Sequence, residues 1–92
     1  MIVEIADEAA AEFSTSLDYL RARNGPAANR IRAAVERAID SLSVLPNRGR
    51  NGALIGTREI VARETSYVVV YQVAAERVLV LRIRHISQDP QP

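Results

Sequence analysis

The chain has 92 residues, of which 48% are hydrophobic and 25% are charged, and its formal net charge is +1. This composition predicts one globular domain spanning residues 1–92 and excludes an intrinsically disordered chain, and the lack of cysteine excludes disulfides and thiolate chemistry. No basic segment precedes an apolar run near the N-terminus and no apolar run approaches the length of a membrane span, so we expect a cytoplasmic protein.

The N-terminal half predicts a short strand followed by a helix. Met1–Ile5 alternates apolar and polar residues, which is typical of a strand, and Asp7 is a plausible N-cap for the helix that follows. Apolar residues then recur at spacings of three and four, which places them on one helical face. They are Ala10, Phe13, Leu17 and Leu20.

A second helix follows the Asn24-Gly25-Pro26 break. Gly25 is suited to a left-handed cap that ends the first helix, and Pro26 is suited to the first position of the next. The apolar positions of the second helix are Ala27, Ile31, Val35, Ala38, Leu42 and Leu45. Because the break is short, the two helices must run antiparallel as a hairpin.

The segment Pro46–Thr57 has the composition of a loop. It contains three glycines together with Arg48 and Arg50. A loop of this length is long for so small a domain, and such loops are often functional.

Three strands complete the chain, with breaks between them that are short enough for hairpins. We expect them at Arg58–Glu64, Tyr67–Val73 and Val78–Arg84. The predicted order is therefore β-α-α-β-β-β, an α+β fold in which the helical hairpin packs on one face of a mainly antiparallel sheet.

Alternation along the last strand divides its side chains between two faces. We assign the face with Leu79, Leu81 and Ile83 to the helices. The other face then carries Val78, Val80, Arg82 and Arg84, and it is apolar at one end and basic at the other. Such a face is suited to a protein partner, so we expect a second chain to cover it.

Three stretches of the chain carry a resemblance to a known family. Leu45–Gly52 resembles an L-x-x-x-P-x-x-G-R-x-G loop, Gly56–Val61 a G-T-R-E segment, and Tyr67–Tyr71 with Val80–His85 a Y-x-V-x-Y strand and an R-x-x-H ending. In this order they resemble the RelE/ParE toxins of bacterial type II toxin–antitoxin systems. The resemblance covers nearly the whole chain, from Ile2 to about Pro90.

The resemblance implies a growth-arresting toxin that a cognate, ParD-like antitoxin neutralises by wrapping a segment around it. We expect Val78, Val80, Arg82 and Arg84 to bind that antitoxin. Family members divide into RelE-like toxins, which cut mRNA in the ribosome, and ParE-like toxins, which inhibit DNA gyrase and act in plasmid stabilisation.

If the chain were an mRNA endonuclease, its catalytic candidates would be Arg58, Arg63 and His85, with Glu59 or Glu64 as a base. Each candidate has a structural alternative. Arg58 is equally suited to binding the carbonyl groups of the glycine-rich loop, Arg63 to an ion pair with Glu64 or Glu76, and His85 to capping the edge of the core.

Several features favour the ParE-like branch, and with it a protein that is not itself an enzyme. RNA-directed members are strongly basic, whereas this chain carries +1, although residues 46–92 carry +3. The C-terminal tail also lacks the tyrosine typical of the nucleases. For a gyrase inhibitor, the target-binding candidates are Arg48, Arg50 and Arg58.

Other classes of site are weakly indicated. Tyr67 and Tyr71 share a face and could stack nucleic-acid bases, but only 4% of the residues are aromatic. No phosphate loop and no grouping of metal ligands is present, so we expect neither a cofactor nor a metal.

Overall fold

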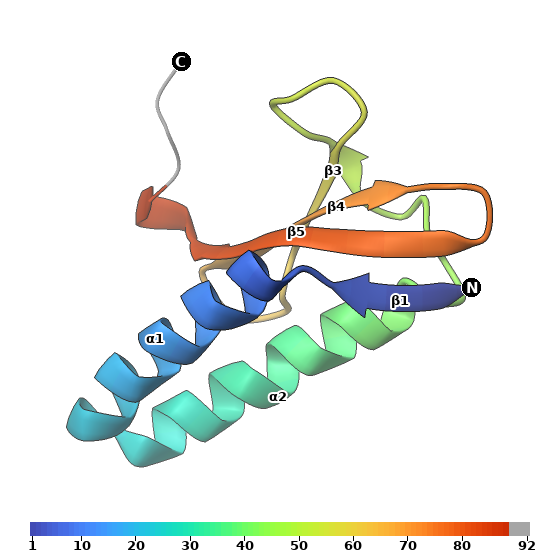
Figure 1. The fold of residues 1–92 in the computed structure, drawn as a ribbon. Helices are drawn as coiled ribbons and strands as arrows, with labels where there is room; N and C mark the ends of the chain where they lie inside the picture. The colour runs from blue at the N-terminus through green and yellow to red at the C-terminus, as the bar shows by residue number, and fades with distance from the viewer. Residues whose placement is uncertain (89–92) are drawn as a thin grey trace.

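The computed structural model describes residues 1–88 and has the predicted α+β order, with one additional short strand (Figure 1). The elements are β1 (Ile2–Ile5), α1 (Asp7–Arg23), α2 (Gly25–Ser41), β2 (Arg50–Asn51), β3 (Arg58–Val61), β4 (Tyr67–Val73), β5 (Arg77–His85) and a 3-10 turn (Ile86–Gln88). Strand β2 lies inside the segment that the sequence predicted to be a loop throughout. None of the helices within residues 1–88 is both long and apolar enough to cross a membrane.

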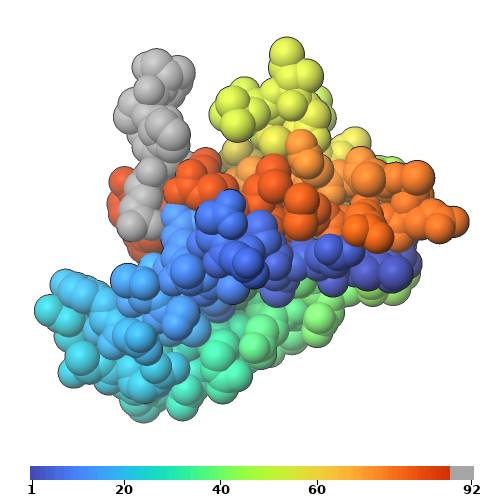
Figure 2. Space-filling view, viewed as in Figure 1, coloured from blue at the N-terminus to red at the C-terminus, as the bar shows by residue number. Residues whose placement is uncertain are grey.

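The strands form one mixed sheet in the order β1-β5-β4-β3-β2. Strands β3, β4 and β5 form an antiparallel meander, while β1 pairs with β5 in parallel, from Ile2 opposite Arg77 to Ile5 opposite Val80. Parallel neighbours need a long crossover connection, and here the helical hairpin and the meander provide it. Both helices lie on one side of the sheet, and the loop between β2 and β3 projects on the other (Figures 1 and 2).

Asn24 alone makes the connection between the helices. Its backbone N–H donates to Leu20 O at 2.7 Å, which ends α1, and its side chain accepts from Ala27 N at 3.0 Å, which caps α2. The prediction that Gly25 takes a left-handed cap is wrong, because Gly25 is the first residue of α2 and its φ is not positive. Pro26 was predicted at the first helical position and lies one residue later, as the second residue of α2, which is still within the first turn.

The start of α1 also differs from the prediction. Ala6 is the N-cap residue and makes no side-chain hydrogen bond, whereas Asp7 is the first helical residue. Asp7 and Glu8 therefore lie in the first turn, where their negative charges interact favourably with the positive end of the helix dipole. Ala9, rather than the predicted Ala10, enters the core.

The core lies between the helical hairpin and the sheet. Phe13 of α1 packs edge-on against Tyr67 of β4, with ring centroids 5.8 Å apart. Other buried side chains of this core include Leu17, Val35, Ile39, Leu42, Ile60, Val69, Tyr71, Val78, Val80 and Ile83. Burial of these side chains holds the two layers together.

A β-bulge in β5 reverses which side chains face the helices. Val70 pairs with Arg82 but Tyr71 pairs with Val80, so Leu81 is an extra residue without a partner. Val78 and Val80 are fully buried against the helices, and beyond the bulge Ile83 is the residue of β5 that packs into this core. The prediction that Leu79 and Leu81 face the helices is therefore wrong.

The same bulge divides the predicted antitoxin-binding set. Val78 and Val80 lie beneath the chain's own helices, while Arg82 and Arg84 lie beyond the bulge, opposite Val70 and Val68 of β4. The prediction that all four share one face is wrong, because one added residue inverts a period-2 pattern.

Candidate functional site

The face of the sheet turned away from the helices is centred on Glu59 of β3. This carboxylate is buried, with 9% of the residue exposed. It accepts a hydrogen bond from Arg50 Nη2 at 3.3 Å and from Ala53 N at 3.4 Å, and it lies 3.9 Å from Arg84 Nη2. A buried carboxylate needs such partners, so Glu59 ties β2, the following loop and β5 together.

Arg84 is the most enclosed arginine of this face, with 8% of the residue exposed. It lies opposite Val68, which is fully buried on the same face. Because its guanidinium lies beside the Glu59 carboxylate, Arg84 contributes to the floor of the site and offers little surface to a partner.

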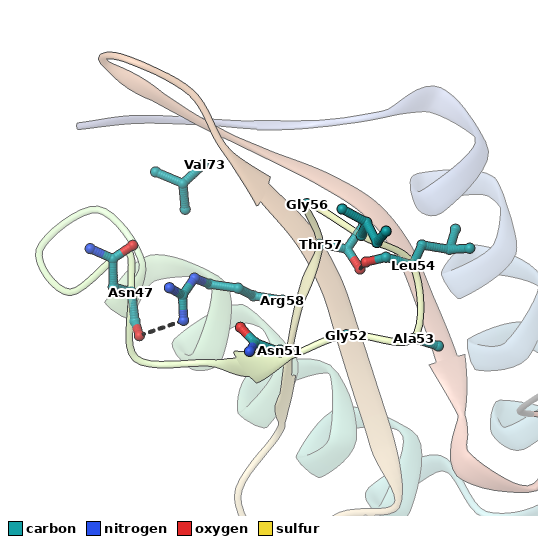
Figure 3. A pocket seen from close by; sticks show the side chains of 10 residues that line it. Asn47, Asn51, Gly52, Ala53, Leu54, Gly56, Thr57, Arg58 and Val73 are labelled. Carbon is teal, nitrogen blue, oxygen red and sulfur yellow. Dashed lines mark hydrogen bonds between the residues drawn. The ribbon is translucent and has the colours of Figure 1, made fainter.

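The loop that connects α2 to β3 is closed at its base by Tyr71 and Arg58. The Tyr71 hydroxyl donates to Pro46 O at 2.8 Å and accepts from Gly49 N at 2.9 Å. Arg58 Nη1 donates to Gly49 O at 2.7 Å and to Asn47 O at 3.2 Å, the second of which is drawn in Figure 3. A Cβ atom at Gly49 would lie 2.6 Å from the Tyr71 hydroxyl, so this close approach requires glycine.

The outer part of the loop presents two aliphatic side chains to solvent. Thr57 holds this part in place, since its O accepts from Gly52 N at 2.8 Å and its Oγ1 donates to Leu54 O at 2.6 Å. Leu54 is 72% exposed and Ile55 is completely exposed at the tip. In Figure 2 this part of the chain stands clear of the sheet on the side opposite the helices. The local hydrogen bonds thus hold an apolar projection that takes no part in the core.

Hollows flank this projection on two sides. One of about 580 Å³ lies toward Asn47, Asn51, Arg58 and Val73, as Figure 3 shows. The other, of about 310 Å³, lies over the sheet and is lined by Glu59, Val70, Leu81, Arg82 and Arg84. Ala53, Leu54 and Thr57 line both hollows. An apolar projection beside an apolar groove with a charged margin has the form of a protein-binding surface.

Arg82 lies at the border between this face and α1. Its Nε and Nη2 donate to the two oxygens of Glu12, at 3.1 and 2.5 Å. Glu12 also accepts from the backbone N–H of Ile83 at 3.2 Å. That stretch of β5 has no strand partner on this side, because β1 pairs only as far as Val80. Glu12 therefore closes an open strand edge with its side chain.

The Arg82 pair also changes the acidity of Glu12. The hydrogen bond from the Arg82 guanidinium holds the pKa of Glu12 below its ordinary value of 4.5, against the opposing effect of burial. The bond from Ile83 N and the charge of Arg84 act in the same direction as Arg82. Glu12 is thus ionised under ordinary conditions.

The three residues proposed for an RNase do not meet. Arg58 lies opposite Tyr71 and His85 opposite Tyr67, four residues apart along β4, which corresponds to about 13 Å. The Arg58 guanidinium binds loop carbonyls, as its structural alternative predicted. Arg63 is 92% exposed and pairs with Glu64 at 3.7 Å.

His85 lies at the edge of the core between β5 and α1. Its ring packs edge-on against Tyr67, with centroids 5.3 Å apart, and its Nδ1 lies 2.7 Å from Ser87 Oγ and accepts from Ser87 N at 3.1 Å. This placement agrees with a core-capping role. A hollow of about 450 Å³ beside it is lined mostly by Thr15, Ser16, Tyr19 and Leu20 of α1.

The three arginines predicted to bind the target also lie in different parts of the structure. Arg50 pairs with Glu59 on the outer face, Arg58 binds the loop, and Arg48 donates to Ser41 Oγ of α2 at 2.8 Å.

The roles of Glu59 and Glu12 as buried or half-buried partners of arginines were not predicted from sequence. For Glu12 a signal was present, because it lies three residues after Ala9 and next to Phe13 on the apolar side of α1. Within residues 1–88, no three or more His, Cys, Asp or Glu side chains are grouped as metal ligands.

Comparisons with known proteins agree with the resemblance. Residues 3–90 match the sequence model of the family described as "ParE toxin of type II toxin-antitoxin system, parDE". A protein of Sinorhizobium fredii (strain NBRC 101917 / NGR234) named "Putative toxin Y4kP" is 31% identical over 71 residues, covering 77% of this chain and 73% of the relative. A solved structure titled "Chromosomal ParDE TA system from P. aeruginosa" has a TM-score of 0.83 with 20% identity, covering 92% of this chain and 95% of that one, and this likeness shows the fold alone.

Proposed function

Because the chain belongs to the ParE toxin family of type II toxin–antitoxin systems, we propose that a cognate antitoxin neutralises it and that its target is DNA gyrase. The observation that carries the first part is the apolar projection at Leu54 and Ile55 beside the groove over the sheet. Both features lie outside the core that the chain builds for itself.

The antitoxin segment that fits this surface is amphipathic. Leu54 and Leu81 offer apolar contacts along the groove, and Arg82, which is about half exposed, lies at its margin. A segment that laid apolar side chains against the groove and a carboxylate against Arg82 would bury Leu54 and complete the face. Burial of apolar area supplies most of the free energy of such a complex.

Inhibition of gyrase, rather than cleavage of mRNA, is supported by how the polar groups are used. General acid–base cleavage needs an acid, a base and a cation around one phosphate. Here Arg58 is engaged by the loop, Glu59 is engaged by arginines, and His85 lies at the core edge. A recognition surface makes no such demand on geometry.

Two assays on the purified chain test this proposal side by side. We expect the chain to block supercoiling by DNA gyrase and to leave mRNA intact in a translating lysate. A variant with Arg63→Ala and His85→Ala should inhibit gyrase as the wild type does. Specific mRNA cuts that this variant abolishes would instead establish a RelE-like endonuclease, and a chain inactive in both assays would refute the proposed target.

A further inference from the structure

A groove between α2 and β3 gathers arginines without a carboxylate. It has a volume of about 270 Å³ and lies on the helix side of the sheet edge, away from Glu59. Arg37 enters it from α2, Arg48 from the loop and Arg63 from the turn after β3. The rest of the lining is Ala34, Ala38, Ile60 and Val61.

The arginines of this groove differ from those of the outer face in their partners. On the outer face, Arg50 and Arg84 share Glu59, and Arg82 has Glu12. In the groove, Arg37 makes neither an ion pair nor a hydrogen bond with residues 1–88, and Arg48 binds only the neutral hydroxyl of Ser41.

Arg63 does pair with Glu64, but that pair is weak. Its two atoms are 3.7 Å apart, and the side chains are 92% and 84% exposed. An ion pair so open to solvent contributes little free energy. Three positive charges therefore line one small groove without effective compensation, and a bound anion would relieve their repulsion.

The positive charge also continues along α2. Arg30 lies two helical turns before Arg37, on the same side of the helix and about 10 Å away along its axis. Arg30 makes no ion pair within residues 1–88. A row of cations with this spacing matches a polymer with regularly repeated negative charges.

From this row we infer that the groove and the adjoining side of α2 bind the phosphate backbone of double-stranded nucleic acid without reading its sequence. Guanidinium groups match phosphate oxygens geometrically. The lining contains no aromatic side chain on which single-stranded bases would stack. This site is separate from the antitoxin surface and does not depend on the identity of the toxin's target.

Fluorescence anisotropy with a labelled DNA duplex tests the inference. The logarithm of the association constant should fall with the logarithm of salt concentration with a slope of about −3.6, as expected for four phosphate contacts at about −0.9 each. The double variant Arg37→Gln/Arg48→Gln should reduce the slope to about −1.8 and weaken binding at least tenfold at about 50 mM salt. The double variant Arg37→Lys/Arg48→Lys should retain the steep slope because it retains the charge.

A second double variant controls for net charge. Arg21→Gln/Arg32→Gln removes the same charge from exposed helical ion pairs elsewhere, and circular dichroism would verify that both variants fold. Equal slopes in the two glutamine variants would overturn the inference, as would tighter binding of single-stranded RNA or of a polyglutamate peptide than of duplex DNA. The assay contains neither gyrase nor antitoxin, so failure of the proposed function would leave its result unaffected.

Discussion

The Tyr71 hydroxyl closes the base of the loop, and its removal should loosen the loop without disturbing the core. In Tyr71→Phe the ring keeps its packing, but Gly49 N and Pro46 O lose their partner. The Gly49 bond is buried, so its N–H would be left unsatisfied at a cost of about 1–3 kcal/mol, while the carbonyl of Pro46 can turn toward water. We therefore expect the free energy of unfolding to fall by about 2 kcal/mol.

Urea denaturation measures this change. At a slope of roughly 1–2 kcal/mol per molar urea, the midpoint should fall by about 1–2 M, and the melting temperature by about 8–16 °C for a domain of this size. Tyr67→Phe is the matched control, because Tyr67 is also buried in the core, at 5% exposure, but its hydroxyl makes no hydrogen bond within residues 1–88. Equal losses in the two variants would refute the reasoning, since the effect would then come from the ring environment and not from the loop.

Two further changes test the outer face and its border. Glu12→Gln should flatten the acid side of the plot of unfolding free energy against pH. The pKa of Glu12 in the folded protein lies below 4.5, so the ionised carboxylate contributes its full stabilisation above about pH 4.5. That stabilisation is lost as the pH falls through the folded pKa. Thermal melts of both proteins across that range would show this, and parallel profiles would contradict it. Leu54→Asp should weaken antitoxin binding by roughly tenfold to a hundredfold, because burying a leucine in a complex contributes about 1.5–3 kcal/mol. The melting temperature of the free protein should be nearly unchanged, since Leu54 is 72% exposed. Calorimetric titration with the antitoxin measures the first effect, and unchanged affinity would remove Leu54 from the interface.

Much of the fold could be read from the sequence because its elements are strongly patterned. The apolar spacing of Phe13 and Leu17 and the β-branched run of β4 each specify one structure. The face of β5 could not be read, because Val78 to Leu81 is apolar at every position and nothing in the alternation from Leu81 to Arg84 marks Leu81 as a bulge. The bulge is set by how β5 pairs with β4, and not by the local pattern of Val78–Arg84.

The candidate site was harder to predict for a related reason. Arg58 is a plausible phosphate ligand in the sequence, and only the path of the loop shows that it binds Asn47 and Gly49. Glu59 was considered as a base, yet it serves as a buried acceptor for Arg50 and Arg84. Which charges are compensated depends on contacts between residues far apart in the chain, and residue types alone do not encode those contacts.

That distribution of compensated charge changes the expected basis of antitoxin binding. The sequence suggested a partner-binding face with Arg82 and Arg84 at its basic end, but Glu59 and Glu12 already pair with arginines of this region. A carboxylate of the antitoxin would have to compete with these internal partners, so its net electrostatic gain is small. The free energy of the complex must then come mainly from the apolar projection and groove, and affinity should depend little on salt. In the groove between α2 and β3, Arg37 and Arg48 have no carboxylate partner within residues 1–88, so an anionic ligand there would not have to displace one from them.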